Sequence, residues 1–242
     1  MEQGVFAQGF ADDGVVVIIG KALKILCEVM QRIIHGVEKW CMDRHLSINP
    51  SKTELILFTR KYKPDLLSSI YFYGEELEQQ TQVKYLGVVL DSKLNWSIHI
   101  DSKCNKALIS LNQLRRSIGK TWGLTLRTAR WMYTAIIRPS LTYAAVVWWP
   151  RVKLKTASRQ LDHLQRLACL FITGALRTTP TKALEIIVDL LPLPIFIMQT
   201  AMLACLRLRV SHQWVHSHCG HTVIQTHLEK LAPLLCLEGI KL

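Results

Sequence analysis

The spacing of apolar residues changes near residue 100 of this chain, and that change limits the folds open to it. Before that point, short runs of β-branched and aromatic residues flank a helical pattern over residues 21–45. After it, apolar residues recur only at helical spacing. The sequence therefore predicts an α+β fold. Its expected parts are a mixed strand and helix region over residues 1–100, an all-α bundle over residues 101–212 and a C-terminal tail over residues 213–242.

Individual elements are expected from local patterns. "TELILFT", residues 53–59, alternates like a strand, Gly74 centres a hairpin, and "VKYLGVVLD" reads as one last strand. In the second part a helix is expected to stop before Pro139, because proline inside a helix removes a hydrogen bond. The apolar stripes of the later helices should form a core, with Trp131, Trp148 and Trp149 inside it.

The formal net charge of +12 is concentrated in the middle of the chain. Residues 1–102 hold 11 Lys and Arg against 13 Asp and Glu, residues 103–177 hold 14 against 1, and residues 178–242 hold 5 against 4. The three segments therefore carry −2, +13 and +1. Such an imbalance is typical of a surface that binds a polyanion, whereas ordinary solvated helix faces mix both signs.

The basic side chains of this segment fall opposite the apolar stripes of the expected helices, so they are candidates for binding nucleic acid. They are Lys103, Lys106, Arg115, Arg116, Lys120, Arg127, Arg130, Lys153, Lys155, Arg159 and Arg166.

Two adjacent carboxylates, Asp12 and Asp13 in "GFADDG", lie between two strand-like runs. One interpretation is a plain hairpin turn, because Asp tolerates unusual backbone angles and bonds its own backbone. The other is a metal site, because two neighbouring carboxylates repel each other unless a hard divalent cation neutralises them.

Cysteine usage and hydropathy point to the inside of the cell. The 7 cysteines are odd in number and have no paired spacing, and no signal peptide is evident. No run of 18 apolar residues is uninterrupted, which argues against a membrane span. We expect an intracellular protein, nuclear or cytoplasmic, without a membrane partner, and the sequence specifies no oligomeric state.

Several blocks in order resemble reverse transcriptases. "GFADDG" resembles their Phe/Tyr-Ala-Asp-Asp box. "VEKWCMDRHLSINPSKTELILFTRK" and "VKYLGVVLDSKLNWSIHI" are similar to the two blocks that follow it in non-LTR (LINE-type) retrotransposons. "WMYTAIIRPSLTYAAVVWWP" and "LQRLACLFITGALRTTPTKALEIIVDLLPL" are similar to the thumb and connecting region of the Jockey-like and I-like groups. The resemblance extends from about Gly9 to about Arg209.

The resemblance implies a partial polymerase palm, an antiparallel sheet with a helix, followed by a helical thumb and connection. It implies RNA-directed DNA polymerase chemistry, with an RNA template and a DNA primer or target as partners. Asp12 and Asp13 would hold Mg²⁺, and Lys52 would lie near the phosphates of the incoming nucleotide. Residues 85–87, which are Tyr85, Leu86 and Gly87, would lie near the primer end.

The chain also departs from the family pattern. The family has a further metal-binding Asp on an upstream strand, whereas nine residues precede Phe10 here and none is Asp. We therefore expect a truncated reverse transcriptase with a weak, incomplete Mg²⁺ site, which binds nucleic acid and uses deoxynucleotides only if that site is completed. One alternative is a non-catalytic RNA-binding or protein-interaction relic with the Asp pair as a structural turn. Another is a membrane-surface module built on basic helices.

A last cluster, "HSHCGH", places His216, His218, Cys219 and His221 close together. These are zinc-ligand residue types, but tetrahedral sites need a second, more distant pair, and only Cys236 follows. We predict a polar loop here and not a zinc site.

Overall fold

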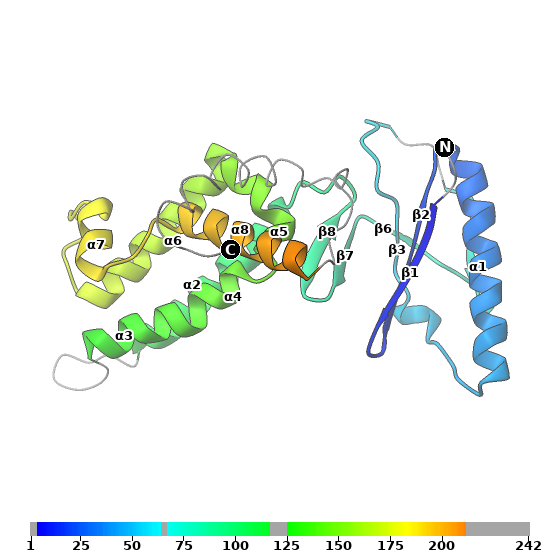
Figure 1. Cartoon of the computed structure of the whole chain (residues 1–242), viewed down its shortest axis with the longest axis horizontal. Coiled ribbons are helices and arrows are strands. Elements are labelled where there is room, and N and C mark those ends of the chain that lie inside the picture. Colours follow the sequence, from blue (N-terminus) through cyan, green and yellow to red (C-terminus); the bar gives the residue numbers. More distant parts are fainter. Residues whose placement is uncertain (1–3, 64–66, 117–124, 212–242) are drawn as a thin grey trace. The chain divides into compact units, whose positions relative to one another are not determined.

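The structure is a computed structural model that describes residues 4–63, 67–116 and 125–211. The chain forms two compact units, residues 1–94 and residues 95–242. The cluster at residues 216–221 and Lys120 lie outside the described residues. We describe each unit separately (Figure 1).

The N-terminal unit combines one long helix with short strands. Its elements are β1 (Gly4–Phe10), β2 (Asp13–Ile19), α1 (Leu23–Asp43), the 3₁₀ turn η1 (Pro50–Lys52), β3 (Leu55–Ile56), β4 (Tyr71–Phe72), β5 (Glu75–Glu76), β6 (Gln79–Gln80), β7 (Gln82–Tyr85) and β8 (Val88–Asp91). The pairs β1–β2, β4–β5 and β7–β8 are antiparallel, and β3–β6 is parallel. Among the described residues the strands thus form four two-stranded sheets, not the one antiparallel sheet expected for a palm.

Two strand predictions were wrong in extent. "VKYLGVVLD" is not one strand but the hairpin β7–β8, because Leu86 and Gly87 both have positive φ, at 45° and 80°. This pair of left-handed residues is the type I′ turn that joins tight hairpins, and glycine adopts it without steric cost. The strand expected over residues 53–59 is only two residues long, at β3.

A small core holds α1 against β4. Cys27, Ile70, Phe72 and Leu77 are buried there. The Gln31 side chain also links α1 to β4 by hydrogen bonds. Its amide nitrogen donates to the Tyr71 carbonyl at 2.9 Å, and its amide oxygen accepts from the Tyr71 N–H at 2.8 Å.

The C-terminal unit is helical throughout its described part. Its elements are α2 (Ser97–Arg116), α3 (Leu126–Met132), the π-helix η2 (Tyr133–Ile137), α4 (Arg138–Thr142), α5 (Ala145–Trp148), the 3₁₀ helix η3 (Trp149–Lys153), α6 (Lys155–Thr173), α7 (Thr181–Val188) and α8 (Leu193–Val210). Helix α6 contacts α2, α7 and α8, so it lies at the centre of the bundle (Figure 1). The described chain is rich in helix with small sheets, which is consistent with an α+β fold.

The helix expected to stop before Pro139 continues through it. Tyr133 and Arg138, which bound the π-helix η2, both have right-handed helical φ and ψ, so α3, η2 and α4 form one continuous rod. A π turn contains one more residue than an α-helical turn. The extra residue accommodates a position where the regular i→i−4 backbone hydrogen bonds are broken.

The bundle core contains two of the three tryptophans predicted there. Trp148 and Trp149 are buried, but the prediction for Trp131 was wrong, because its side chain is 61% exposed. Ala129 and Tyr133 face the core, and Trp131 is two residues from each. Two residues turn a helix by about 200°, which directs Trp131 to the opposite side.

One described helix, α8, is long and apolar enough to span a membrane, with a mean hydropathy of 1.5 over its 18 residues. Its buried residues, Leu193, Ile197, Ala201 and Cys205, are four apart and face the bundle core. Helices in the core of a bundle satisfy the same length and composition criteria.

Burial of His99 makes the bundle sensitive to acid. The ring is 1% exposed and lies 5.6 Å from the ring of Trp148, and burial together with Lys103 and Lys106 lowers its pKa to about 4. The unfolded chain therefore binds a proton below pH 6.5 that the folded chain binds only near pH 4, so stability falls as pH falls through this window.

We expect the free energy of unfolding to fall by about 2 kcal/mol between about pH 7 and about pH 5, because a proton must leave the ring on folding. Urea unfolding of the chain at the two pH values measures this. His99→Gln should remove most of the pH dependence. If this variant loses as much unfolding free energy between the two pH values as the wild type does, other titratable groups cause the pH dependence.

Candidate functional site

The Asp pair lies at the tip of the first hairpin. Strands β1 and β2 pair from Gly4 with Ile19 to Phe10 with Asp13, which leaves Ala11 and Asp12 as the two turn residues. Asp12 and Asp13 are both exposed. Ala11 has φ of 53°, a left-handed conformation that costs a non-glycine residue about 1–2 kcal/mol. Tight hairpin turns require such a residue, and Tyr73 and Leu86 adopt the same positive φ on the other tight hairpins, so this geometry fits a plain turn as well as a functional tip.

The tip supplies only part of a metal site. Two carboxylates fit Mg²⁺, which takes oxygen ligands, but this ion demands octahedral coordination. In the described ranges, no group of three or more His, Cys, Asp or Glu side chains is arranged to hold a metal ion. A cation at Asp12 and Asp13 would therefore complete its coordination with water or with other ligands.

The other residues assigned by resemblance lie on separate turns. Lys52 is exposed and ends η1, a turn capped by the Asn49 side chain, which accepts from the Ser51 N–H at 3.0 Å. Residues 85–87 form the end of β7 and the β7–β8 turn. Among the described residues, no hydrogen bond or ion pair joins Lys52 to Asp12 or Asp13.

The basic residues predicted on the helices fall into two groups. Four of them bind parts of the bundle itself. Lys103 donates to the Ser140 carbonyl at 3.4 Å and lies over the Tyr143 ring at 4.9 Å, and Lys153 lies over the Trp149 ring at 4.7 Å.

Arg130 and Arg166 are the most strongly engaged of these four. Arg130 donates to the carbonyls of Val188 at 2.6 Å and Asp189 at 3.0 Å, and it pairs with the Asp189 carboxylate at 3.1 Å. Arg166 donates to the carbonyls of Arg177 and Thr179 and to the hydroxyl of Thr181. Both guanidinium groups thus hold the connections on either side of α7.

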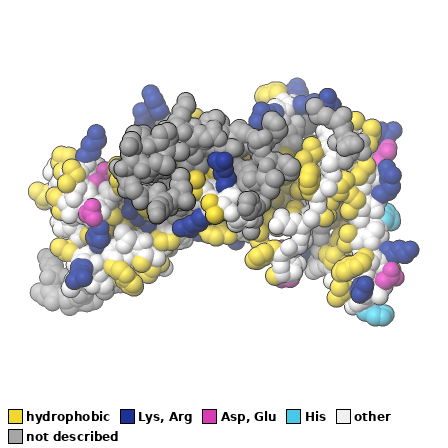
Figure 2. All heavy atoms as spheres, viewed as in Figure 1, with side chains coloured by type: hydrophobic (Ala, Val, Ile, Leu, Met, Phe, Trp, Pro, Cys, Tyr) yellow, Lys and Arg dark blue, Asp and Glu magenta, His cyan; other side chains and the backbone are white. Residues whose placement is uncertain are grey.

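The remaining predicted residues within the described ranges are exposed and project from α2, α3 and α6. They are Lys106, Arg115, Arg116, Arg127, Lys155 and Arg159. Figure 2 shows that Lys and Arg side chains outnumber acidic ones on the face in view. These six are the side chains best able to meet a polyanion.

Two further arginines that the sequence analysis did not select have structural partners. Arg138 is buried, donates to the Leu191 carbonyl at 2.7 Å and lies over the Phe196 ring at 3.9 Å, and burial lowers its pKa. Nearby, Gln165 donates to Glu185 at 2.7 Å and to the same Leu191 carbonyl at 2.8 Å. Only the tertiary structure reveals this network, because its members are far apart in sequence.

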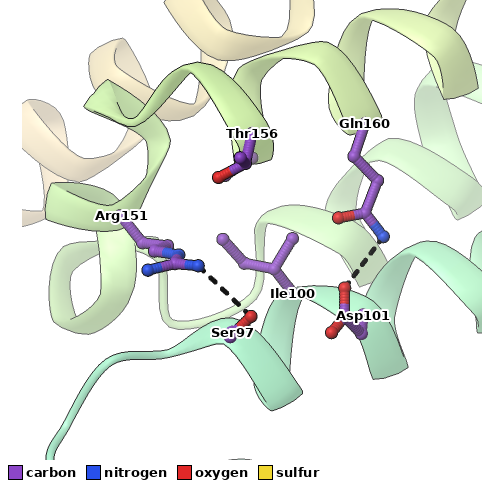
Figure 3. Close-up of a pocket in the computed structure, with 7 residues that line it drawn as sticks. Ser97, Ile100, Asp101, Arg151, Thr156 and Gln160 are labelled. Atoms are coloured by element: carbon purple, nitrogen blue, oxygen red, sulfur yellow. Dashed lines mark hydrogen bonds between the residues drawn. The ribbon is translucent and has the colours of Figure 1, made fainter.

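The second, Arg151, lines a pocket of about 120 Å³ between α2 and α6 (Figure 3). Its guanidinium donates to the Ser97 hydroxyl at 3.3 Å, and the Gln160 amide donates to Asp101 at 3.0 Å. These two bonds join α2 to η3 and to α6.

Comparison with known proteins identifies relatives of the chain. It is 27% identical over 189 residues to the retrovirus-related Pol polyprotein from the type-1 retrotransposable element R1 of Bradysia coprophila, which covers 78% of this chain and 19% of that protein. It is 27% identical over 164 residues to the probable RNA-directed DNA polymerase from transposon BS of Drosophila melanogaster, covering 68% and 18%. Its homologues are non-LTR retrotransposon proteins.

A third relative extends the same group. The RNA-directed DNA polymerase from mobile element jockey of Drosophila funebris is 24% identical over 184 residues, which is 76% of this chain and 20% of that protein. The predicted resemblance to non-LTR reverse transcriptases is thus confirmed at modest identity. The chain spans about 19% of the length of the first of these retrotransposon proteins. No protein-family profile matches it, and no solved structure is significantly similar to it.

Proposed function

We propose that this chain is a segment of a non-LTR reverse transcriptase that contributes the Asp-Asp hairpin, the primer-end turn and the helical thumb and connection. The observation that carries the proposal is the exposed pair Asp12 and Asp13 at the tip of the β1–β2 hairpin, in a chain whose homologues are RNA-directed DNA polymerases. Its partners would be an RNA template and a DNA primer or target, inside the cell.

The exposed basic residues of the helical unit would hold those partners through their phosphates. Such contacts depend on charge and not on base sequence, and they suit an enzyme that copies any template. The six side chains from Lys106 to Arg159 are candidates for this role because they are exposed among the described residues.

The tip would bind Mg²⁺ or Mn²⁺ through Asp12 and Asp13, while Lys52 and residues 85–87 would lie near the nucleotide phosphates and the primer end. In phosphoryl transfer, divalent ions stabilise both the attacking and the leaving oxygen. Two carboxylates alone give weak binding, because an octahedral ion then keeps most of its water. We propose that polymerisation requires carboxylates beyond the described pair.

Asp12→Asn tests the metal assignment. We expect it to abolish the weak binding of Mn²⁺, measured by electron paramagnetic resonance, because one of two adjacent charges is lost. Stability should change by about 0.5 kcal/mol or less, because the tip buries little.

The chain offers a matched control on a second tight hairpin, β4–β5. Glu75 and Glu76 are also adjacent, exposed acids after a left-handed turn, at Tyr73 and Gly74. Glu75→Gln should leave Mn²⁺ binding intact. Equal losses in both variants would mean that the ion follows surface charge alone, and a large loss of thermal stability in Asp12→Asn would make the Asp pair a structural turn.

A further inference from the structure

One exposed aromatic ring in the N-terminal unit has three basic neighbours in sequence and a fourth cation over its ring. Arg60, Lys61 and Lys63 flank Tyr62 in "TRKYKP", and Lys93 comes from the turn after β8. Tyr62 is 87% exposed, and the Lys93 ammonium lies 5.9 Å from the centre of its ring. All four basic residues are exposed.

Backbone hydrogen bonds bring these two distant segments together. The Thr59 N–H donates to the Ser92 carbonyl at 3.1 Å, and the Ser92 N–H donates to the Thr81 carbonyl at 3.1 Å. The Thr59 hydroxyl accepts from the Lys61 N–H at 3.2 Å, which fixes the turn that leads into Tyr62. The cluster is therefore positioned by the fold and is not only a run of basic sequence.

Its composition matches the chemistry of surfaces that bind single-stranded nucleic acid. On such surfaces a base stacks on an aromatic ring while cations follow the phosphates. A tyrosine ring with an ammonium over it offers an aromatic group and a cation together. Residues 60–63 contain no acid, and the nearest acids in sequence are Asp65, two residues after Lys63, and Asp91, two residues before Lys93.

We propose that Tyr62 and the cations Arg60, Lys63 and Lys93 form a contact site for single-stranded RNA or DNA. One unstacked base lies on the Tyr62 ring, and the phosphates on its two sides bind Lys93 and the Arg60–Lys63 turn. The proposal rests on the proposed function, since it assigns to a nucleic-acid-binding chain a contact that the basic helices do not supply.

Equilibrium titration of the whole chain with two short fluorescent oligomers tests the site. One is oligo(dT), and the other is an abasic oligomer of equal length with the same phosphates and no bases. Tyr62→Ala should weaken oligo(dT) binding about fivefold or more and leave the abasic oligomer unaffected, whereas Tyr62→Phe keeps the ring and the affinity. Lys93→Gln should weaken both oligomers and reduce the salt slope by about 0.7.

Tyr71→Ala is the matched control, because Tyr71 is an exposed tyrosine of the same unit outside the cluster. It should leave both affinities unchanged. If wild type binds oligo(dT) and Tyr62→Ala binds equally well, the site is refuted while the proposed function stands. If wild type binds neither oligomer, the proposed function fails as well. Binding to phosphatidylserine vesicles that depends on Tyr62, with unchanged oligo(dT) binding, would overturn the site in favour of a membrane.

Discussion

Trp148→Ala is expected to lower the free energy of unfolding of the helical unit by about 3–5 kcal/mol, because it removes a large buried ring and leaves a cavity. The Trp148 side chain is 1% exposed, and its indole N–H donates to the Tyr143 carbonyl at 3.0 Å. Trp131→Ala, which shortens the same residue type on an exposed helix face, should change that free energy by about 0.5 kcal/mol or less.

Urea unfolding followed by circular dichroism measures both variants. Trp148→Phe retains most of the ring and loses the hydrogen bond, so it should lie between them at about 1 kcal/mol. This order remains measurable even if Trp148→Ala does not fold. A loss in Trp131→Ala as large as that in Trp148→Phe would place Trp131 in the core, as its sequence pattern predicts.

Features that depend on neighbouring residues were predictable from the sequence. "GFADDG" between two runs of β-branched and aromatic residues predicted the β1–β2 hairpin, and the pattern over residues 21–45 predicted α1. The β7–β8 hairpin was missed because Leu86-Gly87 lacks the Asn or Asp that usually marks a type I′ turn. Its left-handed turn became visible only in the backbone.

Features that depend on distant residues were not predictable. Arg130 and Arg166 look like surface cations in the sequence, yet carbonyls that follow them by many residues occupy their donors. The Tyr62 cluster was not predicted for the same reason, because it depends on the backbone hydrogen bond between Thr59 and Ser92. The sequence therefore indicated that the helices were basic, but the structure was needed to separate the basic side chains that hold the fold from those that remain exposed.

The exposed basic side chains, and not those bonded within the bundle, are expected to matter for binding nucleic acid. Reversing Arg115 and Arg116 to Glu should weaken binding to single-stranded nucleic acid about 25-fold at moderate salt, because two phosphate contacts are lost at about fivefold each. The dependence of log K on log salt should become shallower by about 1.4. Binding should fall alike for all base sequences, since phosphates and not bases are contacted.

Arg207 and Arg209 provide a control of equal charge. Like Arg115 and Arg116, they are exposed and lie in the last turn of a long helix, so both double reversals disturb the helix dipole equally. Each takes the net charge from +12 to +8, since two Arg→Glu changes remove 4 charges. If both double variants lose the same affinity for nucleic acid, net charge alone drives binding and the assigned surface is wrong. A loss confined to Arg115 and Arg116 would locate the nucleic acid along α2, because only position distinguishes the two variants.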